Sequence, residues 1–352
     1  MGSFKSMSRG IVAVLLLALL AGCGTSKPAD QKPAEAPKQQ EAAKPAETAK
    51  PAQPVDINVA TATTAGVYYP LGNAFAVMWS DKVPGVKASA QATAGTVENV
   101  KLLGRKEAEV AFAQNGVIFY AVTGTGSFAQ QGKQSFLRGV THLYPNVMHI
   151  VVRKDANVKS VADLKGKKFV PGANGSATEL NSREILSLAN IDYRERKDIT
   201  VDYLDYGQAA DAVKNRQAAG AMIAGGLPTA AVIDMFTSGD VELLSLSDAE
   251  IEALGKKYPW YFKHVIPKGT YKGQEQDVVT VAVANILVTR EDMPEDVIYN
   301  LTKALYDNHA QLVQAHKAAA DMKLVDGLKG ITGVVELHPG AAKFFKEKGV
   351  LK

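Results

Sequence analysis

Hydrophobic and polar positions alternate in a regular way through residues 55–110. Short apolar or strand-like runs occur at 57–60, 86–92 and 110–113. Between them, apolar residues recur every three or four positions, which predicts helices. The first predicted helix has Leu71, Phe75 and Met78 on one face, and the second has Val97, Val100 and Leu103. Strands that alternate with helices in this order predict a parallel sheet with crossover helices.

A second set of the same kind follows. Strand-like runs occupy 147–152, 167–170, 201–204, 221–224 and 241–246, and helical patterns occupy 178–189, 207–217 and the residues after Pro228. A long strand at 278–289, a helix over 294–317 and a short helix over 340–348 complete the chain. The sequence therefore predicts an α/β protein of two lobes: lobe I from residues 55–150 plus 277–352, and lobe II from residues 151–276.

Loops that follow strands are the natural ligand site of such a fold, because ligands bind beyond the carboxyl ends of the strands. Five of them are rich in glycine, hydroxyl or amide side chains and contain neither Arg nor Lys: 61–70, 91–99, 112–116, 171–179 and 224–229. Backbone amides and hydroxyls at helix starts suit an anionic or zwitterionic ligand. Taken singly, each loop is also consistent with plain helix capping. The candidate ligand-binding residues are Thr64, Tyr68, Tyr69, Thr93, Gln114, Asn115, Ser176, Ala177, Thr178, Glu179 and Gly226.

The loop at 171–179 carries the sharpest pattern. Ser176 and Glu179 fit a capping box, in which each side chain bonds the other residue's backbone N–H. The backbone amides of Ala177 and Thr178 would then point out of the helix start, where the dipole favours a carboxylate. A capping box more often marks only a helix start. Arg153 and Arg183 lie near these loops in sequence, and a surface role is expected for both.

The amino-terminal segment has the pattern of an exported lipoprotein. A basic start is followed by a ten-residue apolar run at 11–20 and by Leu-Ala-Gly-Cys ending at Cys23. The run is too short for a permanent membrane span and is typical of a signal peptide over 1–22. The motif resembles a bacterial lipobox, which predicts lipidation of Cys23 and anchoring at a membrane surface; the alternative is an ordinary signal peptide cut near Ala21. Residues 23–54 are rich in Pro, Ala, Lys and Glu and predict a disordered tether.

Composition narrows the function. The chain has 352 residues, 46% of them hydrophobic, which suits globular lobes rather than a multi-span membrane protein. Its one Cys excludes a disulfide framework, and its six His show no metal-ligand spacing, so we expect no metal and no cofactor. Neither a Gly-x-Ser-x-Gly elbow nor a basic patch is present, which argues against an enzyme and against nucleic-acid binding. Seven of 40 basic and four of 36 acidic residues lie in 1–54, which leaves a net charge of +1 for 55–352.

Several stretches together resemble the TAXI family. They are GVYYPLG at 66–72, QAT at 91–93 with Glu98 and Asn99, FAQN at 112–115, SVADLKG at 160–166, GSATE at 175–179 and HPGAA at 338–342. TAXI proteins are the solute receptors of TRAP transporters, and the resemblance covers essentially all of 55–352. It implies a two-lobed periplasmic-binding-protein fold of type II. It also implies a small carboxylate ligand, such as glutamate, glutamine or a 2-oxoglutarate-like molecule, and a TRAP permease as membrane partner.

Two positions depart from the TAXI pattern. Ala94 and Ala177 stand where the family often has glycine, and Ala177 adds a methyl group where a ligand would approach. Pocket size in this chain is therefore expected to differ from that of its relatives. We expect a monomeric receptor whose lobes close on the ligand. The alternative is a surface lipoprotein of the same fold that senses a ligand and signals to a membrane sensor kinase.

Overall fold

The computed structural model describes residues 54–352. The predicted signal peptide, the predicted lipidation site Cys23 and the tether up to residue 53 lie outside the described residues. Ten strands form one sheet in the order β2-β1-β3-β10-β4-β7-β5-β6, with β8 paired to β4 and β9 paired to β10. The strands are β1 Val55–Ala60, β2 Val86–Gln91, β3 Val110–Gln114, β4 Leu137–Arg153, β5 Lys168–Val170, β6 Thr200–Val201, β7 Gly220–Gly225, β8 Val241–Leu243, β9 Phe262–Ile266 and β10 Val278–Arg290.

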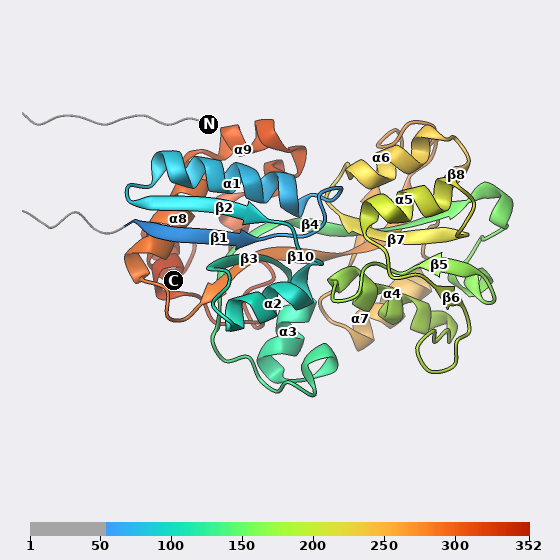
Figure 1. Ribbon diagram of the computed structural model, residues 1–352, viewed down its shortest axis with the longest axis horizontal. Helices are drawn as coiled ribbons and strands as arrows, with labels where there is room; N and C mark the ends of the chain where they lie inside the picture. The colour runs from blue at the N-terminus through green and yellow to red at the C-terminus, as the bar shows by residue number, and fades with distance from the viewer. Residues whose placement is uncertain (1–53) are drawn as a thin grey trace, which may run out of the picture. The chain divides into compact units, whose positions relative to one another are not determined.

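Two groups of parallel strands lie at the ends of this sheet. β1 pairs in parallel with β2 and β3, and β5 pairs in parallel with β6 and β7. We call the part built on β1, β2 and β3 lobe I, and the part built on β5, β6 and β7 lobe II. The antiparallel strands β4 and β10 run between them and belong to both (Figure 1). Buried side chains accordingly separate into clusters beside each group of strands.

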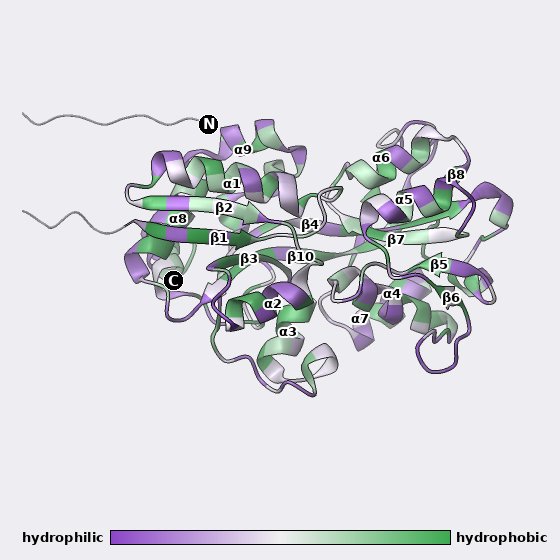
Figure 2. Cartoon of the chain, viewed as in Figure 1, coloured by the Kyte–Doolittle hydropathy of each residue, from purple (hydrophilic) through white to green (hydrophobic). Residues whose placement is uncertain are grey.

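Helices cover both faces of each lobe. In lobe I, α1, α8 and α9 lie on one face and α2 and α3 on the other; in lobe II, α5 and α6 lie opposite α4 and α7 (Figure 1). The apolar sides of these helices turn inward and the polar sides outward, as Figure 2 shows. The helices are α1 Tyr68–Lys82, α2 Thr96–Gly104, α3 Asn115–Thr123, α4 Ala177–Leu186, α5 Tyr206–Lys214, α6 Ala230–Thr237, α7 Asp248–Lys257, α8 Glu295–Asp307, α9 His309–Ala315 and α10 Pro339–Glu347.

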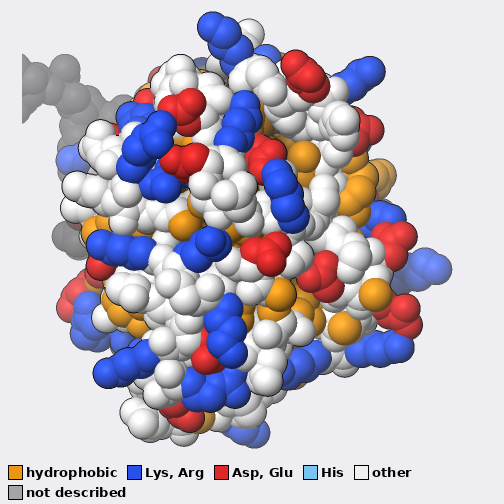
Figure 3. All heavy atoms as spheres, turned by 90° about the vertical axis from the view of Figure 1, so that its right-hand side faces the viewer, with side chains coloured by type: hydrophobic (Ala, Val, Ile, Leu, Met, Phe, Trp, Pro, Cys, Tyr) orange, Lys and Arg blue, Asp and Glu red, His pale blue; other side chains and the backbone are white. Residues whose placement is uncertain are grey.

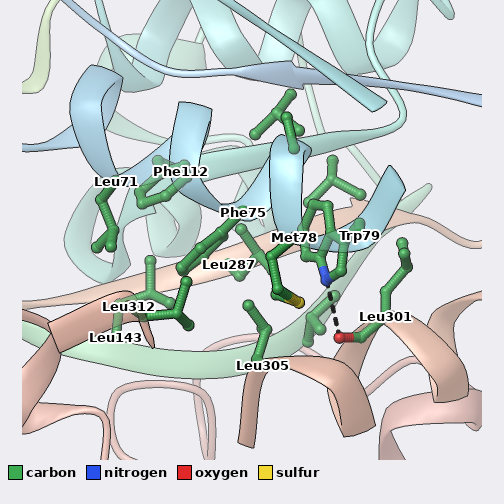
Figure 4. Close-up of a cluster of buried hydrophobic side chains, with 14 of the residues drawn as sticks. Leu71, Phe75, Met78, Trp79, Phe112, Leu143, Leu287, Leu301, Leu305 and Leu312 are labelled. Atoms are coloured by element: carbon green, nitrogen blue, oxygen red, sulfur yellow. Dashed lines mark hydrogen bonds between the residues drawn. The ribbon is translucent and has the colours of Figure 1, made fainter. Parts of the chain in front are cut away.

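The core of lobe I is centred on α1. Phe75 and Trp79 are fully buried, and Phe75 also stacks on Phe112 of β3 with ring centroids 5.3 Å apart. Trp79 donates a hydrogen bond from Nε1 to the carbonyl of Leu301 in α8 at 3.0 Å (Figure 4). This contact joins the first helix to a segment more than 200 residues later, so α1 is fixed against the sheet by both chain halves.

Several element predictions need correction. β4 begins at Leu137, ten residues before the predicted strand, because its first part carries Arg, His and Pro and lacks a plain apolar run. The predicted helix over 294–317 is two helices that meet at Asn308, whose side chain bonds the Ala304 carbonyl at 2.9 Å. The sequence interpretation also missed α3, α7 and β9. α7 is capped by Ser247 and Glu250 in a full capping box.

A buried histidine in lobe II should make the stability depend on pH. His149 is fully buried, its Nδ1 bonds the Ile223 carbonyl at 3.1 Å and its Nε2 lies 2.8 Å from the Tyr271 hydroxyl. Burial lowers the pKa of His149 to about 4, from 6.5. The folded state therefore stays neutral while the unfolded state takes up a proton, so stability is full above pH 6.5 and falls as the pH drops towards 4.

We expect the stability of His149→Gln to fall less than that of the wild type as the pH drops from 6.5 towards 4. At 1.36 kcal/mol per pH unit, the histidine accounts for about 2 kcal/mol between pH 7.5 and pH 5. Urea denaturation at the two pH values measures this difference within each variant, so the constant cost of the substitution cancels. Equal losses in both proteins would show that His149 does not titrate as described.

Candidate functional site

A small, partly open cavity lies between the two lobes and has about 50 Å³ of free space. Loops that follow β1 and β2 contribute one side of it with the end of β3, and loops that follow β5 and β6 contribute the other with the end of β7. It thus lies where the carboxyl ends of both parallel groups meet, as the fold requires. The residues that line it are Ala62, Thr63, Gly66, Val67, Tyr68, Thr93, Ala94, Gly95, Thr96, Gln114, Tyr144, Asn146, Ala173, Ser176, Ala177, Thr178, Asp205, Tyr206 and Ala224.

Four helices begin at this cavity. The first residues of α1, α2, α4 and α5 are Tyr68, Thr96, Ala177 and Tyr206, and all four line it. The amino end of a helix carries a partial positive charge and unpaired backbone N–H groups. Within residues 54–352, the cavity lining contains neither Lys nor Arg. Attraction of an anion to this cavity therefore has to come from the backbone, because the charged side chain in the lining is the carboxylate of Asp205.

The start of α4 differs from the predicted capping box. The Ser176 hydroxyl accepts the Glu179 N–H at 3.1 Å, as predicted. The Glu179 carboxylate does not return the bond; it accepts instead from Arg183 at 2.8 Å and from the Tyr193 hydroxyl at 2.9 Å. Arg183 is therefore committed to an ion pair along α4 and lies away from the cavity. Arg153, the other arginine considered, pairs with Asp155.

A buried asparagine holds the loops of lobe I in place. Asn99 of α2 donates from Nδ2 to the carbonyls of Thr61 and Phe112, both at 2.8 Å. Its Oδ1 lies 2.7 Å from the hydroxyl of Thr93, which lines the cavity. One side chain thus ties together the ends of β1, β2 and β3. This network fixes the position of the loops without using a cavity-facing charge.

Three tyrosines line the cavity beside its Ser and Thr hydroxyls: Tyr68, Tyr144 and Tyr206. Tyr68 donates to Asn285 Oδ1 at 2.5 Å, and Tyr206 donates to the Ala224 carbonyl at 2.7 Å. Because the one hydroxyl proton of Tyr206 is used there, the Thr178 hydroxyl 2.7 Å away is the donor in their contact. Burial raises the pKa of Tyr68, Tyr144 and Tyr206, so all three phenols are neutral at pH 7.

Two polar atoms in the cavity wall lack a hydrogen-bond partner among residues 54–352. They are the Tyr144 hydroxyl and Asn146 Oδ1, both on β4 and both buried. A buried polar group without a partner costs on the order of 1–3 kcal/mol. Such a cost is recovered when a ligand supplies the missing bond. The cavity therefore offers a neutral hydroxyl and an amide oxygen to whatever occupies it.

Six of the predicted site residues meet in this cavity: Tyr68, Thr93, Gln114, Ser176, Ala177 and Thr178. Of the two adjacent tyrosines, Tyr68 is the one that faces it. Thr64 is exposed in its loop, where Thr63 lines the cavity instead. Gly226 packs behind the cavity wall against Tyr144. The remaining predicted residues that do not line it are Tyr69, Asn115 and Glu179.

Sequence reasoning missed the residues that β4 and α5 contribute. Tyr144 and Asn146 belong to the part of β4 that the apolar pattern did not reveal. Tyr206 and Asp205 start α5, where Asp205 and Gln208 form a capping box. The residues of this box in the sequence predict a helix start after β6, at the same edge of the sheet as the other cavity loops. The Asp205 carboxylate is engaged there, since it accepts the Gln208 N–H at 2.9 Å.

Several contacts hold the lobes together around the cavity. The Glu98 N–H of lobe I donates to the Gly175 carbonyl of lobe II at 3.2 Å. Nearby, Tyr120 of α3 donates to the Glu184 carboxylate of α4 at 2.8 Å, and Tyr261 donates to the same carboxylate. Burial raises the pKa of Glu184. The lobes are thus closed over the cavity in this structure.

Comparison with known proteins places the chain in a family. A model of the NMT1-like family matches residues 59–349, which is most of the chain. The protein belongs to the NMT1-like family. The match covers nearly the same residues as the resemblance to the TAXI family, which stays a prediction.

Solved structures show the fold of this NMT1-like protein. The periplasmic binding protein BugD is similar over 86% of this chain and 100% of its own, with 15% identity and a TM-score of 0.52. The alkanesulfonate-binding protein SsuA from Xanthomonas axonopodis pv. citri, bound to MOPS, is similar over 86% of this chain and 96% of its own, with 14% identity and a TM-score of 0.47. An ancestral arginine-binding protein bound to arginine is similar over 74% of this chain and 96% of its own, with 14% identity and a TM-score of 0.45. The predicted two-lobed periplasmic-binding-protein fold is confirmed.

The described residues offer neither a metal cluster nor a membrane span. Residues 54–352 contain no cluster of three His, Cys, Asp or Glu side chains suited to a metal ion. Within the same range, every helix is too short or too polar to cross a bilayer. The surface at the end of lobe II mixes Lys and Arg with Asp and Glu, as Figure 3 shows.

Proposed function

We propose that this NMT1-like protein is an extracytoplasmic solute receptor that binds a small carboxylate or amino acid between its lobes. One observation carries the proposal: four helices start at the interlobe cavity, whose lining within residues 54–352 contains neither Lys nor Arg. Helix amino ends bind carboxylates through backbone N–H groups and the helix dipole. The N–H groups of Ala177 and Thr178 at the start of α4 are the proposed seat of the ligand carboxylate.

The two unpartnered atoms refine the ligand class. Asn146 Oδ1 can only accept a hydrogen bond, so it suits the ammonium group of an amino acid or a hydroxyl of the ligand. The Tyr144 hydroxyl can donate to a second oxygen. Glutamate, glutamine and 2-oxoglutarate-like molecules are therefore the first candidates.

Closure of the lobes is the proposed mechanism of capture. The contacts between Glu98 and Gly175 and between Tyr120 and Glu184 exist only when the lobes meet. A ligand shifts the equilibrium towards this closed form only as far as it binds that form better. A ligand that bridges α2 of lobe I and α4 of lobe II meets this condition, because separation of the lobes would remove half of its contacts.

Export and anchoring complete the proposal. The signal peptide over 1–22, lipidation at Cys23 and the tether over 23–54 would hold the receptor at a bacterial membrane. There, as a TAXI-type monomer, it would deliver its ligand to a TRAP permease. We propose the lobe boundaries given above, 55–150 plus 277–352 and 151–276. The second candidate function, ligand sensing through a membrane kinase, uses the same cavity and differs only in the partner.

A thermal-shift screen of amino acids and dicarboxylates tests the ligand class. A bound solute stabilises the folded state by mass action and so raises the melting temperature. At a solute concentration of 100 times Kd the gain in unfolding free energy is about 2.7 kcal/mol. Asn146→Leu removes the unpartnered oxygen at nearly constant volume and should weaken binding of the active compound by roughly 10- to 100-fold. Asn215→Leu, on the exposed end of α5, is the matched control and should bind as the wild type does. Failure of every compound to shift the wild type would count against the proposal.

A further inference from the structure

A second concave site lies on the other side of the strands that join the lobes. Tyr144 and Asn146 of β4 line the interlobe cavity, whereas Pro145 between them lines a separate groove. Successive side chains of a strand point to opposite faces. On β10, Ala284 faces the same groove, while its neighbour Asn285 bonds Tyr68 at the cavity. The groove and the cavity therefore lie on opposite faces of β4 and β10.

A β-bulge adds a histidine to the groove. Ala284 pairs with Pro145, but Ile286 pairs with His142, so the register shifts between them. The extra residue in β4 turns His142 to the face of Pro145. His142 and Pro145 both line the groove. Its floor is thus built from the joining strands together with Asn115 at the start of α3.

Both lobes contribute walls to this groove. Trp260 and Phe262 come from lobe II, and Phe119 comes from α3 of lobe I. Trp260 packs on Phe119 with ring centroids 5.6 Å apart, and Phe262 is 42% exposed. The groove volume is about 690 Å³, within the range of sites that hold a small molecule. Aromatic walls of this kind suit a flat ring.

Two acceptors lie in the floor without a partner in the described part of the chain. They are Asn115 Oδ1 and His142 Nδ1, and both side chains are more than nine-tenths buried. Burial, with a contribution from the charge of Lys329, lowers the pKa of His142 to about 4. At pH 7 the imidazole is neutral, and the hydrogen bond to the backbone of Lys329 favours the proton on Nε2, which leaves Nδ1 as the acceptor. Both acceptors in the floor can therefore receive hydrogen bonds from the donors of a bound molecule.

Charges at the rim balance. Asp321, Lys323, Asp326 and Lys329 all line the groove, and Asp326 pairs with Lys329 at 2.8 Å. Two acidic and two basic side chains give no net preference for an ion. An uncharged ligand fits this rim better than an anion. The groove therefore differs in its expected ligand from the interlobe cavity, for which an anion is proposed.

We propose that this groove is a second small-molecule site, for a flat, uncharged aromatic ring that carries hydroxyl or N–H donors. The ring lies against Trp260, Phe119 and Phe262, and its donors bond Asn115 and His142. This site is distinct from the solute cavity, because the two lie on opposite faces of β4 and β10. Asn115, predicted with Gln114 to bind the transported solute, instead serves the groove, since the two neighbours line different sites.

Resorcinol, a ring with two hydroxyl donors, is the probe that tests the groove. The chain has two Trp, and Trp79 is fully buried in lobe I, so quenching on titration reports on Trp260. We expect saturable quenching, with toluene binding at least tenfold more weakly because it lacks donors. Phe262→Ala and Asn115→Leu should each weaken resorcinol binding at least tenfold. Tyr203→Ala removes another exposed aromatic of lobe II and should leave it unchanged.

Thr332→Trp provides a check that does not disturb the floor. Thr332 is exposed at the rim, so a large side chain there fills the groove and leaves the core intact. It should abolish resorcinol binding while the melting temperature stays at the wild-type value. Absence of saturable quenching in the wild type would overturn the proposal. Equal binding of toluene and resorcinol, or binding unaffected by Thr332→Trp, would do the same.

Discussion

Ala177→Asp should abolish binding of small carboxylates by this receptor. Ala177 is the first residue of α4, is buried and lines the interlobe cavity. An aspartate there places its own carboxylate at the helix amino end, which favours the helix and blocks the ligand. Two like charges about 4 Å apart repel by on the order of 4 kcal/mol at an effective dielectric constant of 20. Affinity should therefore fall by roughly a thousandfold.

Ala177→Asn is the matched control for that result. It has the same shape as aspartate but no charge, so the difference between the two variants isolates the electrostatic effect. Calorimetric titration with the compound found in the thermal-shift screen measures both. Equal affinities for the two variants would show that the ligand's acidic group does not sit at the start of α4.

Trp79→Ala should be the most damaging single substitution in the core of lobe I. The side chain is fully buried, packs on Phe75 with centroids 5.4 Å apart, and bonds the Leu301 carbonyl. Truncation of a buried Trp costs about 3–5 kcal/mol, and here it also leaves a carbonyl without its donor. We expect the melting temperature to fall by roughly 10 °C.

Val77→Ala on the same helix supplies the comparison. Val77 is 57% exposed, so its truncation should change stability by less than about 0.5 kcal/mol. Differential scanning calorimetry of both variants tests the arrangement of α1. Equal melting temperatures for the Trp79→Ala and Val77→Ala proteins would contradict the packing of α1 against α8.

Most of the fold and part of the cavity could be predicted from the sequence pattern. Apolar runs alternating with helical periodicity predicted both lobes, and glycine- and hydroxyl-rich loops after the strands led to six of the eleven candidate residues. These features are local, since a strand end and a helix start are written in adjacent residues. For the same reason the sequence alone assigns Ser176, Ala177 and Thr178 to a helix start at the cleft.

Other features depend on long-range pairing and could not be predicted. Tyr144 and Asn146 reach the cavity because β4 extends beyond its apolar part, where pairing with β10 overrides a weak strand pattern. Gln114 and Asn115 were grouped because they are adjacent. One ends β3 and the other begins α3, so they face different sites. The bulge that turns His142 into the groove likewise depends on the register between two distant strands.

A crystal structure of the protein with the solute identified by thermal shift tests the central claim most directly. The account predicts one solute molecule between the lobes, with its acidic group within hydrogen-bond distance of the Ala177 and Thr178 backbone N–H groups. It also predicts a donor of that solute on Asn146 Oδ1. A solute bound outside the cavity, or one whose acidic group is neutralised by a Lys or Arg side chain instead, would contradict it.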